Sequence, residues 1–295
     1  MNKVALIGCG AMGGAIGTRL AQVGEDLTVF DLNVDAVARL VALGAKAGGS
    51  AAAAAEGKDF VITSLNSAEI VRAAVFGDGG VAEGAPKSTL LIDMSSIDPP
   101  ATKALAEDAA ARGLAWVDAP LSGGAPKALI GELTVMAGGT PEHFEASKAV
   151  MDKLCKNYTH MGPSGAGQTT KLINQLLCGI GFLAVAEATR LAQDAGVEAA
   201  KIPLALAGGR ADSAILQEYM PRMAAKDYTP TGRIANMVKD LNGVQDLARL
   251  TDTAMPLTAT CAEVHRLLSA IGLGNADQAA LMEFFETRDT SGIPT

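Results

Sequence analysis

The stretch VALIGCGAMG, residues 4–13, places a glycine-rich turn directly after a short apolar run. This G-x-G-x-x-G spacing is typical of a strand that leads into a helix at a dinucleotide-binding site. Gly8 would permit the tight turn, Gly10 would let the backbone approach a pyrophosphate, and Gly13 would allow the helix to pack closely on the strand. Asp31 ends the next apolar run, close to the roughly 20-residue separation expected for a ribose-binding carboxylate. The stretch therefore predicts a Rossmann-type nucleotide-binding domain.

Asp31 also bears on the choice of cofactor. A carboxylate there can accept hydrogen bonds from both hydroxyls of an adenosine ribose, whereas it would repel a 2′-phosphate. The following residues, Leu32 and Asn33, supply no arginine that could neutralise such a phosphate. We therefore expect NAD, with NADP disfavoured. The alternative is that Asp31 merely caps the helix that starts near Asn33.

Short apolar runs alternate with helical segments through the first half of the chain. The expected strands are 4–7, 27–30, 60–65, 90–94, 115–118, 133–137 and 157–160, and the expected helices include 34–43, 68–76, 100–111 and 141–154. Strands that are apolar throughout and separated by helices indicate a parallel sheet covered on both faces. The first half is thus expected to be a doubly wound α/β domain.

The pattern changes after the break at Gly162-Pro163-Ser164. No proline interrupts residues 168–195, which would form a helix roughly 40 Å long. The rest is helical, with stops near Gly208-Gly209, Pro230 and Pro256. The predicted fold is an N-terminal Rossmann-type domain, residues 1–162, and an all-α substrate and oligomerisation domain, residues 163–295. The long connecting helix would cover about 166–195.

Composition excludes several classes of partner. The net charge is −8, from 24 Lys+Arg against 32 Asp+Glu, and the cations form no basic run. Nucleic acid and anionic membranes are therefore poor partners, because phosphate binding needs clustered cations. The longest apolar run, residues 176–186, is too short to span a bilayer. Lys3 and the apolar stretch after it could suggest a signal peptide, but the glycines in that stretch favour the nucleotide-binding turn.

Four cysteines are scattered along the chain: Cys9, Cys155, Cys178 and Cys261. They form no C-x-x-C pair, so neither a zinc site nor a disulfide framework is expected. Reduced thiols in a cytoplasmic protein without a metal site fit this spacing better. Cys9, inside the glycine-rich turn, is expected to be a small filler residue.

Three further motifs follow in order: DMSS at 93–96, DAPLSGG at 118–124 and GAGQTTKLINQ at 165–175. Together with the glycine-rich start, they resemble the β-hydroxyacid dehydrogenase family. That family includes 3-hydroxyisobutyrate dehydrogenase and tartronate semialdehyde (2-hydroxy-3-oxopropionate) reductase. The resemblance runs from the first strand to Asp277, and four ordered motifs are far more specific than any one of them.

Ser122, Gly123 and Gly124 follow a predicted strand, at the sheet edge where doubly wound folds bind ligands. One hydroxyl and two unobstructed backbone N–H groups form a natural cradle for a substrate carboxylate. The alternative is a plain S-G-G turn.

Lys171 and Asn174 lie three residues apart and share one helix face. The resemblance implies that Lys171 is the general acid/base, which takes the proton from the substrate hydroxyl as hydride leaves for the nicotinamide, and that Asn174 orients the lysine or the substrate. A free lysine titrates near about 10.4, so this role needs a lowered pKa, which burial and a nearby positive charge would supply. The alternative is a helix lysine that extends its amine into solvent.

The resemblance also implies the remaining site residues. Lys239 would lie beside the nicotinamide and the substrate, and Ser96 would contact the nicotinamide ribose. Leu65-Asn66 stands where relatives usually have Leu-Pro, so the sequence departs from the family pattern in this cofactor-contacting loop. The cofactor-binding residues implied are Gly8, Gly10, Ala11, Met12, Gly13, Asp31, Leu65, Asn66, Ser96 and Lys239.

The expected function is hydride transfer between NAD(H) and a small 3-hydroxy acid or its semialdehyde or keto form. Residues 124–128 and 272–277 resemble the tartronate semialdehyde reductase branch. A 3-hydroxyisobutyrate dehydrogenase-like activity is the second candidate within the same family. Two alternatives are an imine reductase-like enzyme and a non-catalytic dinucleotide-binding scaffold, and Lys171 argues against both. The long helix carries more apolar surface than one small domain covers, so a homodimer or homotetramer is expected.

Overall fold

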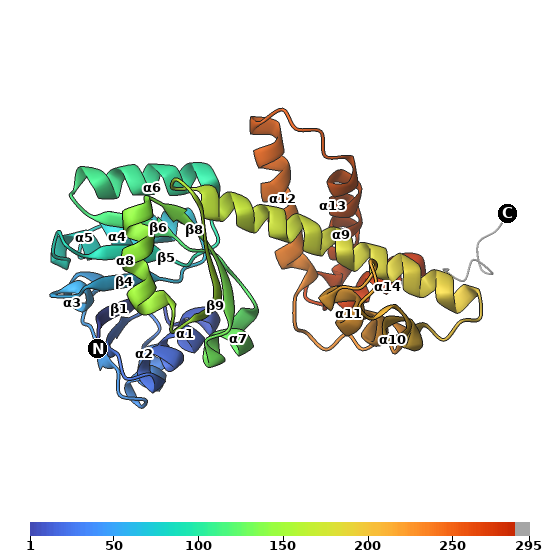
Figure 1. The fold of residues 1–295 in the computed structure, drawn as a ribbon, viewed down its shortest axis with the longest axis horizontal. Helices are drawn as coiled ribbons and strands as arrows, with labels where there is room; N and C mark the ends of the chain where they lie inside the picture. The colour runs from blue at the N-terminus through green and yellow to red at the C-terminus, as the bar shows by residue number, and fades with distance from the viewer. Residues whose placement is uncertain (287–295) are drawn as a thin grey trace. The chain divides into compact units, whose positions relative to one another are not determined.

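The computed structural model describes residues 1–286, and it divides into two compact units (Figure 1). The first unit runs from Met1 to Lys171, and the second begins at Leu172. Helix α9, Ala166–Asp194, starts in the first unit and continues into the second. The division therefore falls inside α9, whereas the boundary expected from the sequence, at residue 162, lies ahead of that helix.

The first unit is built on one sheet. Its strands are β1 (Lys3–Ile7), β2 (Asp26–Phe30), β3 (Lys46–Ala47), β4 (Phe60–Thr63), β5 (Leu90–Asp93), β6 (Ala115–Asp118), β7 (Leu121–Ser122), β8 (Leu133–Gly139) and β9 (Cys155–Gly162). Their order is β3-β2-β1-β4-β5-β6-β8-β7, with β9 paired to β8. The first six strands in this order are parallel. The chain order reverses between β1 and β4, which is where doubly wound sheets bind their ligands.

Helices cover both faces of this sheet. They are α1 (Ala11–Gln22), α2 (Val34–Val41), α3 (Ala51–Ala55), α4 (Ala68–Phe76), α5 (Val81–Gly84), α6 (Pro99–Ala111), α7 (Gly124–Ile130) and α8 (Pro141–Met151). Alternate residues of β1 point to opposite faces, so Val4 and Leu6 pack under α1, α2, α7 and α8. Ala5 and Ile7 pack under α3 to α6. All four are buried, which explains why the strand is apolar throughout.

The doubly wound fold is confirmed, and two details differ from the expectation. Strand β8 is antiparallel to β6, so the sheet is mixed rather than purely parallel. Strands β3 and β7 were not predicted, because two residues are too few to show a hydrophobic period.

The second unit is helical within the described residues. After α9 come α10 (Ile202–Leu206), α11 (Ala214–Ala224), α12 (Ile234–Leu250), α13 (Pro256–Leu268) and α14 (Met282–Phe285), with short 3-10 or π turns at Ala199–Lys201, Ser269–Leu273 and Gln278–Leu281. Its own core includes Phe182, Tyr219, Met223 and Leu241. The predicted stops are confirmed: the diglycine lies between α10 and α11, Pro230 lies between α11 and α12, and Pro256 begins α13.

Helix α9 is long and apolar enough to cross a membrane by length and composition, because its most apolar 18-residue window has a mean hydropathy of 1.5. The longest uninterrupted apolar run did not indicate this, because Gln175 and Glu187 bound it at residues 176–186. Three large apolar side chains of α9 are at least half exposed: Ile173, Leu177 and Leu191. Exposed apolar surface of this kind is typical of interaction sites.

Candidate active site

The turn between β1 and α1 requires glycine at two of its positions. Gly8 has a φ of +95°, and a Cβ there would lie 2.4 Å from the carbonyl oxygen of Ser64. A Cβ at Gly13 would lie 1.9 Å from the carbonyl oxygen of Gly8. Gly10, by contrast, has open space around the position of a Cβ, and no side chain caps helix α1 there. The first N–H groups of α1 are thus left for an anion, which fits a dinucleotide phosphate.

The Asp31 carboxylate is held by two backbone amides. Its Oδ2 accepts a hydrogen bond from Cys9 N at 2.6 Å, and its Oδ1 accepts one from Asn33 N at 2.7 Å. The cap of α2 is Asn33, whose side chain accepts from the amides of Asp35 and Ala36. The capping alternative for Asp31 is therefore wrong.

The thiol of Cys9 packs against this turn. Burial, with a smaller contribution from Asp31, raises its pKa to about 12. A thiol with so high a pKa stays protonated and is a poor nucleophile.

A cavity of about 540 Å³ opens beside the glycine-rich turn. Five of the residues expected to bind cofactor line it: Gly8, Gly10, Asp31, Leu65 and Asn66. The remaining lining residues are Ile7, Phe30, Leu32, Ser50, Ala51, Ser64, Ile70, Ala73, Ala74, Asp78, Gly79 and Gly80. Apolar side chains, one fixed carboxylate and an accessible glycine backbone together suit an adenosine with its phosphates.

Several of these lining residues were not expected from the sequence. The side of α4 contributes Ile70, Ala73 and Ala74, and the turn after α4 contributes Asp78. The glycine-rich sequence at 77–80 was a usable signal, because glycines cluster where the backbone turns sharply or approaches a ligand.

A buried carboxylate links the loops that follow β4 and β5. Asp93, which is fully buried, accepts hydrogen bonds on Oδ1 from Thr63 Oγ1 at 2.7 Å and from Ser95 N at 3.0 Å. Ser95 Oγ in turn accepts one from Leu65 N at 3.0 Å. Burial raises the pKa of Asp93 to about 6 although both hydrogen bonds oppose the shift.

A second buried carboxylate links β6 to the start of α9. Asp118 accepts hydrogen bonds from Gly165 N at 2.8 Å and from Gln168 N at 3.2 Å. A Cβ at Gly167 would lie 2.7 Å from Asp118 Oδ2 and 2.5 Å from the carbonyl oxygen of Met136, so only glycine fits. Burial raises the pKa of Asp118, while these backbone hydrogen bonds act in the opposite direction. The carboxylate caps the helical turn that ends at Lys171.

Sequence reasoning gave no role to either carboxylate. The signal was present, because each one closes an otherwise apolar strand, in LLID at 90–93 and in AWVD at 115–118. Polar residues at the carboxyl ends of parallel strands meet at one edge of the sheet.

The S-G-G motif lies where β7 leads into α7. Gly123 and Gly124 have φ values of +113° and +66°, in the left-handed region that favours glycine. A Cβ at Gly124 would meet nothing closer than Pro126 Cδ at 3.7 Å, so the glycine is required by its backbone conformation and not by crowding. Ser122 pairs with Thr134 of β8, which anchors the motif to the sheet.

Lys171 and Asn174 lie on the same helix but belong to different units, because the division falls between them. Asn174 Nδ2 donates to Gln175 Oε1 at 2.9 Å and to Cys178 Sγ at 3.7 Å. The amide of Gln175 donates to the carboxylate of Asp240, which ties α9 to α12 within the second unit. Lys239 precedes Asp240 on α12 and is exposed.

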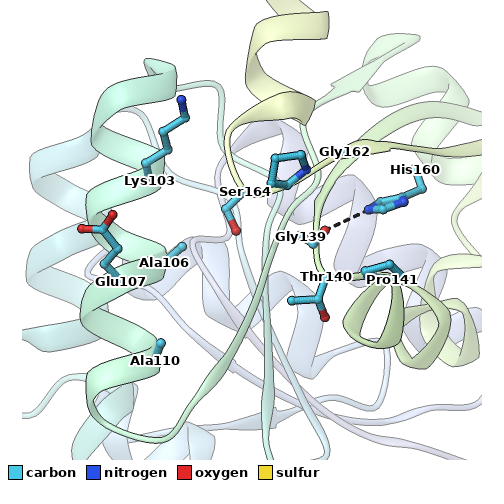
Figure 2. A pocket seen from close by; sticks show the side chains of 11 residues that line it. Lys103, Ala106, Glu107, Ala110, Gly139, Thr140, Pro141, His160, Gly162 and Ser164 are labelled. Carbon is cyan, nitrogen blue, oxygen red and sulfur yellow. Dashed lines mark hydrogen bonds between the residues drawn. The ribbon is translucent and has the colours of Figure 1, made fainter.

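A different hollow, of about 730 Å³, lies on the first unit between α6 and the turn after β8 (Figure 2). None of the site residues expected from the sequence lines it. Its histidine, His160, is hydrogen bonded through Nε2 to the carbonyl oxygen of Gly139 at 2.9 Å, as Figure 2 shows. The hollow is separate from the glycine-rich turn and its cavity.

Two family models together match nearly all of the described chain. Residues 3–162 match the NAD binding domain of 6-phosphogluconate dehydrogenase, and residues 165–285 match the model described as NAD-binding of NADP-dependent 3-hydroxyisobutyrate dehydrogenase. The chain belongs to the β-hydroxyacid dehydrogenase family. It is therefore an oxidoreductase with an NAD(P)-binding Rossmann domain, and the resemblance stated from its motifs is confirmed.

Similar members of the β-hydroxyacid dehydrogenase family are aligned along almost their whole length. The 2-hydroxy-3-oxopropionate reductase of Escherichia coli is 34% identical over 96% of this chain and 97% of its own. The NAD-dependent L-serine dehydrogenase of Pseudomonas aeruginosa is 33% identical over 97% of this chain and 98% of its own. The structure of Mycobacterium tuberculosis 3-hydroxyisobutyrate dehydrogenase with L-serine superposes with a TM-score of 0.89 at 27% identity, covering 97% of this chain and all of that one.

Proposed function

We propose that this β-hydroxyacid dehydrogenase transfers hydride between NAD(H) and a small 3-hydroxy acid or its semialdehyde or keto form, with Lys171 as the general acid/base. The observation that supports this most directly is the position of Asp118. It ends the strand that leads to Ser122, and it caps the helical turn that leads to Lys171. One buried carboxylate thereby connects the proposed carboxylate cradle with the proposed proton-transfer group.

The preference for NAD over NADP is supported by charge in the cavity of about 540 Å³. Two carboxylates, those of Asp31 and Asp78, are among its lining residues, and the described lining includes no lysine or arginine. A 2′-phosphate would meet this negative charge without a cation to offset it. When bound, the nicotinamide accepts or supplies the hydride.

The residues of the chain would share the remaining work. The Ser122 hydroxyl and the N–H groups of Gly123 and Gly124 would hold the substrate carboxylate. The amine of Lys171 would accept the proton of the substrate hydroxyl during oxidation and return it to the carbonyl oxygen during reduction. Asn174 would orient the lysine or the substrate through its amide.

Two more residues complete the proposed site. Lys239 would place a second cation beside the nicotinamide and the substrate. Ser96 would contact the nicotinamide ribose, as the family resemblance implies.

For the substrate we propose a short, polar, hydroxylated acid of the tartronate semialdehyde reductase type, with a 3-hydroxyisobutyrate-like acid as the neighbouring class. Residues 124–128 and 272–277 support the first class by resemblance. Two of the similar proteins carry 2-hydroxy-3-oxopropionate and L-serine in their names, and both molecules are three-carbon acids of this kind.

The test follows NADH absorbance with a panel that contains 2-hydroxy-3-oxopropionate, L-serine, L-threonate and 3-hydroxyisobutyrate. Lys171→Ala should lower kcat by about 10²- to 10⁴-fold, which is the range that general acid–base catalysis typically contributes. Lys148→Ala, which changes a half-buried lysine on α8 that pairs with Glu145, is the matched control and should leave kcat unchanged. Undiminished activity of Lys171→Ala would show that this lysine is not the general acid/base.

The same assay separates the alternatives. An imine reductase-like enzyme would reduce a cyclic imine with NADPH or NADH and leave every hydroxy acid untouched. A scaffold would bind NADH, as seen by fluorescence, without turning over any substrate of the panel.

We also propose that the enzyme is a homodimer or homotetramer of the cytoplasm. Ile173, Leu177 and Leu191 expose 50%, 64% and 71% of their surface along α9, and a second copy of the chain would cover them. Cys9, Cys155 and Cys261 lie outside any disulfide, which suits a reducing compartment.

A further inference from the structure

Gln168 is buried in the first unit, one helical turn before Lys171, and its exposed fraction is 1%. Its side-chain amide makes two hydrogen bonds to one short loop. Nε2 donates to the carbonyl oxygen of Ser95 at 2.8 Å, and Oε1 accepts from Ile97 N at 3.3 Å. These two backbone groups lie on either side of Ser96, the residue proposed to contact the nicotinamide ribose.

The loop that Gln168 holds is itself fixed to its neighbours. Ser95 Oγ accepts from Leu65 N at 3.0 Å, and Ser95 N donates to the buried carboxylate of Asp93 at 3.0 Å. The loops after β4 and β5 and the first turn of α9 thus form one hydrogen-bonded unit. Within it, Gln168 supplies the side-chain link between the Ser96 loop and the turn that carries Lys171.

A long polar side chain is a costly way to fill a buried position. Ordering a glutamine costs side-chain conformational entropy, and its amide must find partners for both of its ends. An apolar residue would fill the volume without either demand. Glutamine adds a fixed register between the helix and the loop, because the hydrogen bonds made by its Nε2 and Oε1 are both directional.

We propose that Gln168 is a positioning residue for hydride and proton transfer. It holds the Lys171 turn in register with the Ser96 loop, and so sets where the proton-transfer amine lies relative to the nicotinamide end of the cofactor. The proposal rests on the roles given above to Lys171 and Ser96. Reactivity is sensitive to such register, since a displacement of about 1 Å can cost about 10²-fold in rate.

Two variants separate hydrogen bonding from volume. Gln168→Met keeps most of the volume but leaves Ser95 O and Ile97 N without their partner. Gln168→Glu keeps the shape, and its ionised form cannot donate to Ser95 O. The protonated form of the same glutamate can donate an O–H to Ser95 O and still accept from Ile97 N, so it reproduces the pattern of glutamine.

The first measurement compares kcat, the KM of the best substrate in the panel and the Kd of NADH. For Gln168→Met we expect kcat to fall by roughly 10- to 100-fold, with KM and Kd within about threefold of the parent. For Gln168→Glu, the ratio of its kcat to that of the parent should rise as the pH is lowered. The proposal would be overturned if the kcat ratio of Gln168→Glu to the parent did not change with pH. It would also be overturned if Gln168→Met weakened NADH binding without lowering kcat.

The matched control is Thr89→Val. Thr89 is fully buried immediately before β5, and its Oγ1 donates to the carbonyl oxygen of Lys58 at 2.7 Å. The change therefore removes a buried hydrogen bond from the same sheet, at the strand end opposite to Asp93. We expect it to lower thermal stability and to leave kcat unchanged. An equal loss of kcat in both variants would show that destabilisation alone explains the effect, which would overturn the proposal.

A double-mutant cycle tests whether Gln168 acts through Lys171. If it does, Gln168→Met should cost little in the Lys171→Ala background, because there is no amine left to position. The same fold-loss in both backgrounds would overturn the positioning role alone. Full activity of Lys171→Ala by itself would instead refute the proposed function, and the inference with it.

Discussion

The carboxylate of Asp31 accepts a hydrogen bond from the backbone N–H of Cys9 at 2.6 Å, which ties the end of β2 to the glycine-rich turn after β1. Its other oxygen is bonded to the amide of Asn33 at 2.7 Å. The orientation of this carboxylate is therefore set by the protein before any cofactor binds. A preorganised charge discriminates between ligands more strongly than a mobile one, because it cannot turn away from a repulsive group.

This arrangement predicts a change of cofactor preference. Asp31→Asn keeps an acceptor for one backbone amide but removes the negative charge, and Leu32→Arg adds a cation at a side chain that is 91% exposed. We expect the combined variant to bind NADPH at least tenfold better than the parent, and NADH about tenfold worse, since hydrogen bonds to charged groups contribute about 1.5–3 kcal/mol. Fluorescence titration with both reduced cofactors measures the two constants.

Leu32→Arg alone is the control for the cofactor swap, and it should improve NADPH binding less than the pair does. The argument from Asp31 fails if the unaltered enzyme already binds NADPH more tightly than NADH.

The raised pKa of Asp93, about 6, predicts a pH-dependent stability. Its folded-state pKa lies above the unfolded value of 3.8, so the folded state holds the proton more tightly. This contribution is fully present below pH 3.8 and is lost as the pH rises through 6. Asp93→Asn removes the titrating group, so its stability relative to the parent should improve by roughly 1 kcal/mol between pH 5 and pH 8.

Urea unfolding across that pH range measures the effect of Asp93→Asn. Thr89→Val, which removes a buried hydrogen bond at a residue that does not titrate, provides the comparison and should give a difference from the parent that does not change with pH. A flat profile for Asp93→Asn would mean that burial does not perturb this carboxyl.

Gly167→Ala should disturb the packing of the first turn of α9 against the sheet. Its Cβ would lie 2.5 Å from Met136 O and 2.7 Å from Asp118 Oδ2, and neither can move without disturbing β8 or the cap of α9. We expect a loss of at least about 2 kcal/mol in the free energy of unfolding, together with a fall in kcat, because the helix carries Lys171. Gly49→Ala, where a Cβ would meet nothing within 4 Å, should stay within about 0.5 kcal/mol of the parent.

The exposed apolar residues of α9 predict the oligomeric state. Leu177→Glu places a charge in the centre of that surface, where burying it against a second copy would be costly. The sedimentation coefficient of this variant should shift towards that of the monomer at micromolar protein concentration. Leu204→Glu on α10 changes a leucine that is 81% exposed and should leave the sedimentation coefficient as it is. A monomeric parent enzyme would refute the prediction outright.

The doubly wound domain was predictable because its signals are local. Strand β1 and the turn after it follow from ten consecutive residues, and the run of alanines at 51–55 coincides with α3. The antiparallel direction of β8 was not predictable, since a hydrophobic pattern reads the same in both directions along a strand. The chain reverses between β7 and β8, through α7, and only the pairing of β8 with β6 and β7 reveals it.

The candidate site was predictable where its residues form motifs and not where they act across the sheet. Asp31, Leu65 and Asn66 were expected from the sequence and line one cavity. Asp93 and Asp118 received no role, because Thr63, which donates to Asp93, and both donors to Asp118 lie in segments far from them in the chain. Their importance follows from the pairing of β5 with β6, which sets the two carboxylates side by side at the end of the sheet.

The glycine-rich turn, the apolar strands and the four ordered motifs determined the fold class and the family from the sequence alone. These features depend on contacts between residues close in the chain, which a linear reading can follow. Only the tertiary structure decided how Asp118 caps α9 and how Gln168 holds the Ser96 loop. Each of these hydrogen bonds joins residues some 50 or more positions apart, and such pairs are selected by packing of the sheet and not by local pattern.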